Sequence, residues 1–202
     1  MKKIFIIIFY LFLLNHSANA LVEVDINRGN LDPLPIAVSP LYLESGSKDI
    51  TQGGKVIKNV GEELSKVIEI NLKRSGLFNP LKKESFVQNP DIAHVKPRFE
   101  DWRLIKAQAL ITGKVTVSEE KLRAEFRLWD VVAAKEMIAL AFSTTPENWR
   151  RVGHLISDKI YQRLTGEEGY FDTRIIYVSE TGLKTQRYKK LAIMDQDGAN
   201  VK

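Results

Sequence analysis

The feature that most constrains the fold is a strict alternation of apolar and charged side chains in residues 121–128. A period of two residues is typical of a β-strand with one buried and one solvated face. Two further strand candidates flank this segment, at residues 109–117 and 136–143, and the first connection is only three residues long. Because short connections join antiparallel neighbours, we expect a meander of three strands.

Two longer segments show the spacing of amphipathic helices. In residues 55–75, apolar side chains recur every three or four positions, and charged side chains occupy the other side. Gly76 stands where a glycine commonly ends such a helix. After the meander, the Thr-Thr-Pro at residues 144–146 combines a hydroxyl cap with a proline at the first helical position, and Gly166 ends this second helix.

The other segments complete the predicted fold. Residues 36–43 are expected to form an extended strand, which Pro40 confines to a sheet edge or forces into a bulge. Residues 45–54 are expected to be a polar loop, residues 81–97 to have little regular structure, and residues 98–108 to form a shorter helix. This order predicts an α+β fold: an α/β two-layer sandwich in which helices cover one face of a mixed, mostly antiparallel sheet.

The last part of the sequence has a different pattern. Residues 174–179 and 191–194 are strand candidates separated by a polar connection at 180–190, and an Asp-Gly pair after the second strand signals a turn. Two strands alone are only marginally stable in water. We therefore expect residues 169–202 to begin a further unit, and the sequence to be a fragment of a longer chain.

The first 20 residues have the features of a secretory signal peptide. Two lysines precede an apolar run at residues 4–14, and small residues at positions 18 and 20 form a cleavage pattern. The run is shorter than the about 20 apolar residues that span a bilayer, so a retained anchor is the weaker alternative. We expect cleavage between Ala20 and Leu21, followed by export.

The composition excludes several kinds of chemistry. The sequence has no cysteine, which rules out thiolate nucleophiles, cysteine metal sites and disulfides. Loss of Lys2 and Lys3 with the signal would reduce the formal net charge from +5 to +3, a value that argues little for binding to nucleic acid. No apolar segment after residue 20 approaches membrane-spanning length, so the mature chain is expected to be soluble.

The motifs that usually carry chemistry are incomplete. His94 and His154 form no H-E-x-x-H pattern, so a surface or hydrogen-bonded structural histidine is preferred to a metal ligand. The Gly-Gly-Lys at residues 53–55 lacks the first glycine and the final hydroxyl of a phosphate loop. Glu119 and Glu120 are adjacent and point in different directions, so a solvated turn is preferred to a catalytic pair.

Two further patterns also favour structure over chemistry. Asp195 and Asp197 resemble part of a calcium loop, but a turn is preferred because the other ligand positions do not match. Trp102, Trp129 and Trp149 are expected to pack in the core rather than to form a ligand platform. The sequence also has no G-x-S-x-G segment. We therefore expect no enzyme activity and no cofactor or metal.

Two stretches carry a resemblance to a known family. RSGLFNPL at residues 74–81 and WRRVGHLISDKIYQRLTGEEGYFDTRIIYV at residues 149–178 are similar to the TolB family, the second at the junction between its amino-terminal domain and its propeller. The resemblance implies an α/β amino-terminal domain followed by a six-bladed β-propeller. It also implies a periplasmic role in the Tol-Pal envelope system, which supports outer-membrane integrity and outer-membrane constriction during cell division.

The resemblance also implies a division of the chain. The expected parts are a signal peptide at 1–20, a partner-binding segment at 21–32, the α/β domain at 33–168 and the start of an incomplete first propeller blade at 169–202.

Partner binding is implied at the mature amino terminus. In the family, the first residues after cleavage bind the carboxy-terminal domain of TolA, and the propeller binds the lipoprotein Pal. Residues 21–26 alternate as a strand does, which suits addition to the edge of a partner's sheet, while a permanent first strand is the alternative. The residues assigned to this site are Leu21, Val22, Glu23, Val24, Asp25, Ile26, Asn27 and Arg28.

Two other functions stay open from the sequence. Similar propellers cap some serine peptidases, so the chain could be the amino-terminal portion of a secreted propeller-bearing serine hydrolase whose G-x-S-x-G segment lies further along. A domain that binds a small ligand through its tryptophans is the third possibility.

Overall fold

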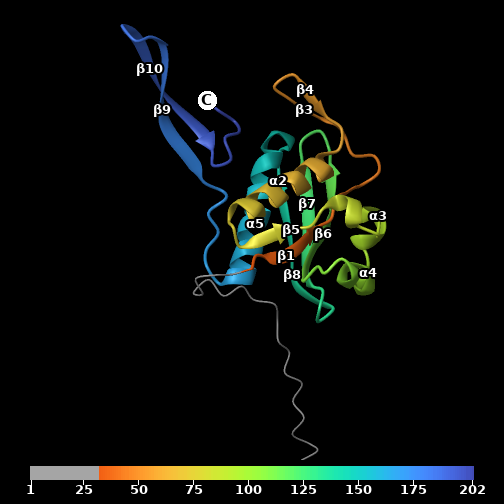
Figure 1. Ribbon diagram of the computed structural model, residues 1–202. Coiled ribbons are helices and arrows are strands. Elements are labelled where there is room, and N and C mark those ends of the chain that lie inside the picture. The colour runs from red at the N-terminus through yellow and green to blue at the C-terminus, as the bar shows by residue number, and fades with distance from the viewer. Residues whose placement is uncertain (1–31) are drawn as a thin grey trace, which may run out of the picture.

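A mixed β-sheet forms the centre of the structure, a computed structural model that describes residues 32–202 (Figure 1). The strands lie in the order β5-β1-β6-β7-β8, and β2 pairs with the second half of β6. β1 is parallel to both β5 and β6, whereas β6, β7 and β8 are antiparallel. The strands are β1 (Leu34–Val38), β2 (Tyr42–Leu43), β5 (Phe78–Pro80), β6 (Ala109–Val117), β7 (Leu122–Asp130) and β8 (Lys135–Thr144).

The antiparallel meander predicted from the alternation is confirmed. β6 has the predicted bounds, and β7 and β8 each differ from the prediction by one residue at either end. Every second side chain of β7 is buried, from Leu122 to Asp130. The alternation in the sequence therefore marks the face of the sheet on which the long helices pack.

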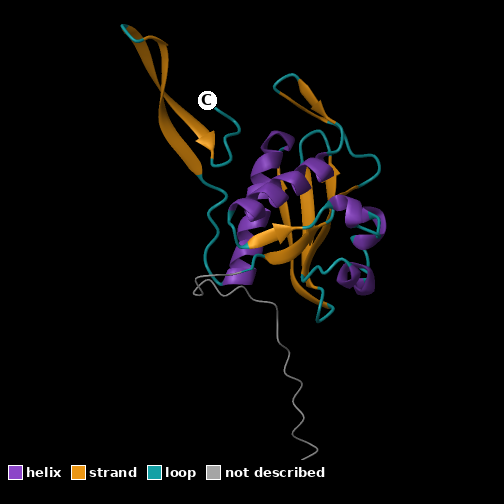
Figure 2. Ribbon diagram, in the orientation of Figure 1, coloured by secondary structure: helices purple, strands orange, loops and turns teal. Residues whose placement is uncertain are grey.

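Two long helices, α2 (Val60–Arg74) and α5 (Trp149–Thr165), pack against each other on one face of the sheet (Figure 2). Gly153 of α5 faces Val67 of α2 so closely that a Cβ atom at Gly153 would lie 2.8 Å from Val67 Cγ1. α5 ends as predicted at Gly166, whose φ of +78° is left-handed. The fully buried side chains of this core include Leu64, Ile68, Leu72, Ile156, Ile160 and Leu164.

The second face of the sheet is partly covered by residues 81–107, whereas the sequence predicted helices on one face only. Trp102 forms a second buried cluster there with Ala37 and Leu110, which alternate in their strands with residues of the main core. Gln88 accepts a hydrogen bond from the Trp102 indole at 3.1 Å. This segment contains the 3-10 turn η1 (Lys83–Ser85) and the helices α3 (Pro90–Ala93) and α4 (Phe99–Leu104).

A short hairpin precedes α2, where the sequence predicted a loop and the first turn of the helix. β3 (Ile50–Gln52) and β4 (Lys55–Ile57) are antiparallel. Gly53 and Gly54 between them have φ of +57° and +77°, as a two-residue hairpin turn requires. The chain therefore continues as a strand, and α2 begins only after Asn59, whose side chain accepts a hydrogen bond from the helix backbone.

The strand predicted at residues 36–43 is interrupted at Pro40. β1 and β2 are separate strands, and the N–H of Leu41 between them donates to Ser65 Oγ of α2 at 2.9 Å. The interruption agrees with the missing N–H of proline, which cannot continue a ladder of hydrogen bonds.

The start of α5 differs from the prediction in one respect. The 3-10 turn η2 (Pro146–Asn148) precedes the helix, and its proline stands at the first position. The Thr145 side chain makes no hydrogen bond to the backbone of this turn, and its hydroxyl accepts one from the Asn148 side chain at 3.1 Å. The predicted hydroxyl cap is therefore wrong.

β9 (Arg174–Leu183) and β10 (Gln186–Asp195) form a separate antiparallel hairpin that extends away from the sheet (Figure 1). Both strands are longer than predicted, because residues 180–183 and 186–190 pair as strands instead of forming a polar connection. The side chains on both faces of this hairpin are largely exposed, so the sequence has no alternation there that would mark a strand.

No helix within residues 32–202 is both long enough and apolar enough to cross a membrane. The predicted signal peptide, its cleavage position and the predicted partner site at residues 21–28 lie outside the described residues.

Candidate functional site

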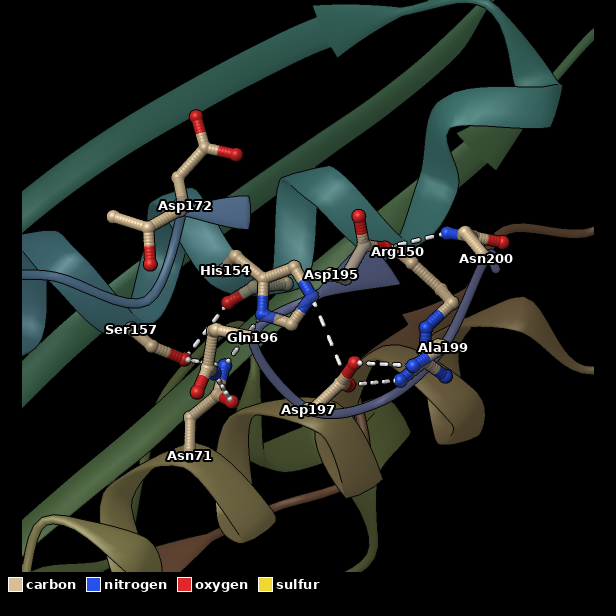
Figure 3. A network of polar contacts seen from close by, with 12 residues as sticks. Asn71, Arg150, His154, Ser157, Asp172, Asp195, Gln196, Asp197, Ala199 and Asn200 are labelled. Atoms are coloured by element: carbon tan, nitrogen blue, oxygen red, sulfur yellow. Dashed lines mark hydrogen bonds and ion pairs between the residues drawn. The ribbon is translucent and has the colours of Figure 1, made fainter. Parts of the chain in front are cut away.

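A cluster of polar side chains joins the β9–β10 hairpin to the two long helices (Figure 3). Its members come from α2, from α5 and from the turn that follows β10, and their side chains converge in one place. We call this cluster the polar latch and define it by Asn71, Arg150, His154, Ser157, Gln196 and Asp197. It is the candidate site that the described part of the chain offers.

Asn71 of α2 is the centre of the polar latch. Its amide oxygen accepts a hydrogen bond from Gln196 Nε2 at 2.9 Å. Its amide nitrogen contacts His154 Nδ1 at 2.9 Å and Ser157 Oγ at 3.0 Å. Because this nitrogen has only hydrogens to offer, His154 Nδ1 must accept, and the proton of a neutral imidazole is on Nε2. Asn71 thus fixes the tautomer of the histidine.

His154 and Arg150 of α5 face Asp197 from the turn. Arg150 Nη2 forms an ion pair with Asp197 Oδ2. His154 Nε2 lies 3.8 Å from the same oxygen, and within residues 32–202 it has no hydrogen-bond partner. The His154 side chain is only 3% exposed and that of Asp197 6% exposed, so the contact is buried.

The surroundings shift the pKa values of both groups downward. Burial lowers the pKa of His154, and the neighbouring Asp197 carboxylate opposes this only in part. Burial alone would raise the pKa of Asp197, but the N–H of Ala199 and the charge of Arg150 outweigh it and lower that pKa. The polar latch therefore favours a neutral histidine beside an ionised aspartate.

The turn after β10 is held by its own hydrogen bonds. The N–H of Gly198 donates to the Asp195 carbonyl at 2.9 Å, and the N–H of Ala199 donates to Asp197 Oδ1 at 3.1 Å. Arg74 of α2 donates to the Gln196 carbonyl at 3.0 Å. The Asp-Gly pair forms a turn as predicted, and the turn presents Gln196 and Asp197 to the helices.

A second polar contact fixes the segment between α5 and β9. Both carboxylate oxygens of Asp158 accept backbone N–H groups, from Phe171 at 2.7 Å and from Asp172 at 3.1 Å. Arg151 binds the Asp172 carboxylate through two nitrogens at 3.0 and 3.1 Å. Burial raises the pKa of Asp158 despite the two N–H donors.

His154, Asp195 and Asp197 could in principle hold a cation, because one donor atom of each lies within 4.8 Å of the others. However, Arg150 already neutralises Asp197, and the Asn200 side chain donates to Asp195 Oδ2 at 2.5 Å. A cation would have to displace both groups. These three side chains therefore suit an ion-paired contact between the turn and α5 better than a metal centre.

The remaining sequence candidates have structural roles. His94 stacks on Tyr42 with ring centroids 4.6 Å apart, and Glu119 is exposed and pairs with Lys48. In the Gly-Gly-Lys segment, the two glycines form the turn of the β3–β4 hairpin and Lys55 begins β4. Trp102 and Trp149 are buried in the two cores, which confirms packing for both.

The polar latch was not predicted as a unit, although two of its members were considered. His154 was expected to be structural, and Asp197 was placed in a turn. The available signal was the spacing of Arg150, His154 and Ser157, which puts three polar side chains on one side of α5.

The fold and the site together define a class of protein: an α/β sandwich domain that is joined through polar contacts to a β-hairpin. Residues 22–137 match the family model of the TolB amino-terminal domain. The chain is 68% identical over 187 residues to the Tol-Pal system protein TolB of Pelagibacter ubique (strain HTCC1062), an alignment that covers 92% of this chain and 42% of that protein. The chain therefore belongs to the TolB family.

A solved structure agrees with this assignment at the level of the fold. The structure of TolB from Acinetobacter baumannii has a TM-score of 0.67 to this chain at 24% sequence identity, covering 85% of this chain and 38% of that one. The chain thus spans about two fifths of the length of both relatives.

Proposed function

We propose that this protein is a non-catalytic adaptor of the Tol-Pal system, exported to the periplasm, where it supports outer-membrane integrity and constriction of the outer membrane during division. The observation that carries the proposal is the 68% identity, over 92% of the chain, to a Tol-Pal system protein. The family match favours this role over that of a propeller-bearing hydrolase.

The site proposed for the partner is the mature amino terminus, residues 21–32. Val22, Val24 and Ile26 alternate with Glu23 and Asp25, a pattern that suits a strand added to the edge of another sheet. Main-chain hydrogen bonds would supply the affinity, and the apolar side chains would supply the specificity. The partner in this proposal is the carboxy-terminal domain of TolA.

A second partner, the lipoprotein Pal, is proposed to bind a propeller domain. Residues 169–202 would form the beginning of that propeller, with β9 and β10 as strands of its first blade. The protein would then connect TolA to Pal without chemistry of its own.

The test of the TolA site is a calorimetric titration of the TolA carboxy-terminal domain with three ligands. A peptide of residues 21–32 and the chain from residue 21 should both bind, and the chain from residue 33 should not. Val24→Pro in the chain should abolish binding, because proline removes a main-chain donor from the added strand.

The control is Glu119→Gln, which removes an exposed charge outside residues 21–32 and should bind within a few-fold of the unmodified chain. Circular dichroism should show an unchanged fold for every variant. Equal binding by the chains from residues 21 and 33 would contradict the assigned site.

A further inference from the structure

His154 is a buried titratable group at the contact between the hairpin and the helices, and the proposed binding function does not use it. Its ring lines a cavity of about 290 Å³ together with Arg150, Asp172 and Asp195. Arg151, whose side chain is 62% exposed, lines the same cavity. The cavity therefore reaches solvent and gives protons a route to the imidazole.

In their present orientations, the hydrogen-bonding groups of the polar latch fit the neutral ring. Protonation places a second N–H on Nδ1, where it would face the N–H₂ group of Asn71 at 2.9 Å. A half-turn of the Asn71 amide would present its oxygen to the ring. The same rotation would remove the oxygen that accepts from Gln196 and the hydrogen that Ser157 receives.

Charged groups face His154 from every element around it. Asp195 and Asp197, at the end of β10, and Asp172, before β9, attract a proton, whereas Arg150 on the same helix repels it. All three carboxylates have cationic or amide partners: Arg150 for Asp197, Arg151 for Asp172 and Asn200 for Asp195.

Two further charged groups lie near the polar latch. Asp158 on α5 is bound by two backbone N–H groups, and Arg74 of α2 adds a positive charge at the Gln196 carbonyl. Because these charges largely compensate one another, burial has the largest effect on the pKa of His154, and it disfavours the protonated ring.

We propose that His154 makes the polar latch a proton-sensitive switch. When the imidazole takes up a proton from solvent at Nδ1, the Asn71–Gln196 contact is lost and the turn at residues 195–200 leaves α2 and α5. No covalent bond forms or breaks; the Arg150–Asp197 ion pair and the hydrogen bond from Arg74 to the Gln196 carbonyl separate as the turn leaves, and loss of the proton restores the docked state. Acid thus frees the hairpin from the α/β domain.

The direction of the pH effect follows from the difference in the pKa of His154 between the docked and the undocked state. The pKa of His154 is lowered in the docked state and returns towards the ordinary value of about 6.5 when the turn leaves. Docking is therefore independent of pH above this value and weakens below it, by up to tenfold per pH unit, until the docked pKa is reached.

The neighbouring carboxylates cannot produce the same effect. The lowered pKa of Asp197 contributes stability that is lost only below the ordinary aspartate value of about 3.9. The raised pKa of Asp158 acts in the opposite sense, because a raised pKa makes the docked state more favourable as the pH falls.

The test follows two signals in one NMR sample of the chain between pH 5.5 and 7.5. The ¹³Cε1 shift of His154 reports protonation, and hydrogen exchange of the Asn71 side-chain amide, corrected for its intrinsic rate, reports opening of the polar latch. The opening constant should rise between pH 7 and pH 5.5, by up to about tenfold. A His154 titration that is accompanied by no change in opening would overturn the proposal.

Two variants complete the design. His154→Asn keeps an acceptor near the position of Nδ1 and has no charge at any pH, so its opening constant should not depend on pH. His94→Asn changes a histidine that stacks on Tyr42, far from the turn, and should keep the full pH dependence. If the His154→Asn variant does not fold, the proposal is tested by the coupled titration of the unmodified chain. If the variant folds and its opening constant still depends on pH, the proposal is contradicted.

Discussion

Gly61 lies directly against the carbonyl group of Leu41, at the start of α2. A Cβ atom at this position would be 2.1 Å from the Leu41 oxygen. The same stretch of backbone is held by Ser65, which accepts the N–H of Leu41. Small residues on one side of α2 thus allow the interrupted strand at Pro40 to pass close to the helix.

Gly61→Ala should therefore destabilise the protein. The added methyl group meets backbone, which cannot rotate away, so we expect a loss of about 1–3 kcal/mol or more in the free energy of unfolding. Urea denaturation followed by tryptophan fluorescence measures this loss. Lys73→Ala, an exposed change on the same helix, should remain within about 0.5 kcal/mol of the unmodified chain. Equal stability of both variants would show that the strand moves freely away from the helix.

Single residues of the polar latch could be recognised from the sequence, but the contacts between them could not. The spacing of His154 and Ser157 on α5 follows from helical periodicity alone. The partner of Asn71, however, is Gln196, which is 125 residues away in the chain. No local pattern encodes that contact, because it depends on how the turn after β10 docks on the helices.

At the scale of the elements, α2 and α5 are in close contact at Gly153. A Cβ atom there would lie 2.8 Å from Cγ1 and 3.1 Å from Cβ of Val67. Valine is branched at Cβ and has little rotational freedom in a helix, so it cannot give way easily. The absence of a side chain at Gly153 therefore sets the distance between the two helices.

Gly153→Ala should lower the free energy of unfolding by about 1–3 kcal/mol, even though alanine is the better helix former. In the double variant with Val67→Ala, the loss in the free energy of unfolding should be smaller than the sum of the two single losses, because the second change makes room for the new methyl group. Chemical denaturation of the four proteins of this cycle measures the coupling. Strictly additive losses would mean that the helices separate instead of clashing.

The strand that sequence predicts most directly is β7, which has one buried face. It alternates because the helices cover one side of it, and this alternation is visible in the sequence. The hairpin at 174–195 is exposed on both sides, so its strands were predicted too short. The start of α2 was placed too early because the apolar spacing extends into β4, while the glycine turn ends in a strand.

At the scale of the whole molecule, the core and the hairpin are separate. The two hydrophobic clusters consist only of residues between Leu34 and Leu164. The hairpin contributes polar contacts to the domain through the turn at residues 195–200. The α/β domain should therefore fold without β9 and β10.

A chain that ends at Thr173 tests this expectation. It retains Phe171, which is buried against Tyr161, and loses the contacts of Gln196 and Asp197. We expect cooperative thermal unfolding, with the free energy of unfolding lower by about 1–3 kcal/mol because hydrogen bonds to the turn are missing. Near-ultraviolet circular dichroism should keep the tryptophan signals, since all three tryptophans lie before residue 173. A broad, non-cooperative transition would show that the hairpin is part of the folding unit.

The polar character of the latch also determines how a movement of the hairpin would appear in calorimetry. Separation of the turn from the helices exposes amide and charged groups and little hydrocarbon; exposure of polar groups lowers the heat capacity, whereas exposure of hydrocarbon raises it. The heat of opening should therefore not rise with temperature, unlike the heat of unfolding the domain. Dissolved ions should promote opening, because they stabilise Arg150 and Asp197 once the pair has separated.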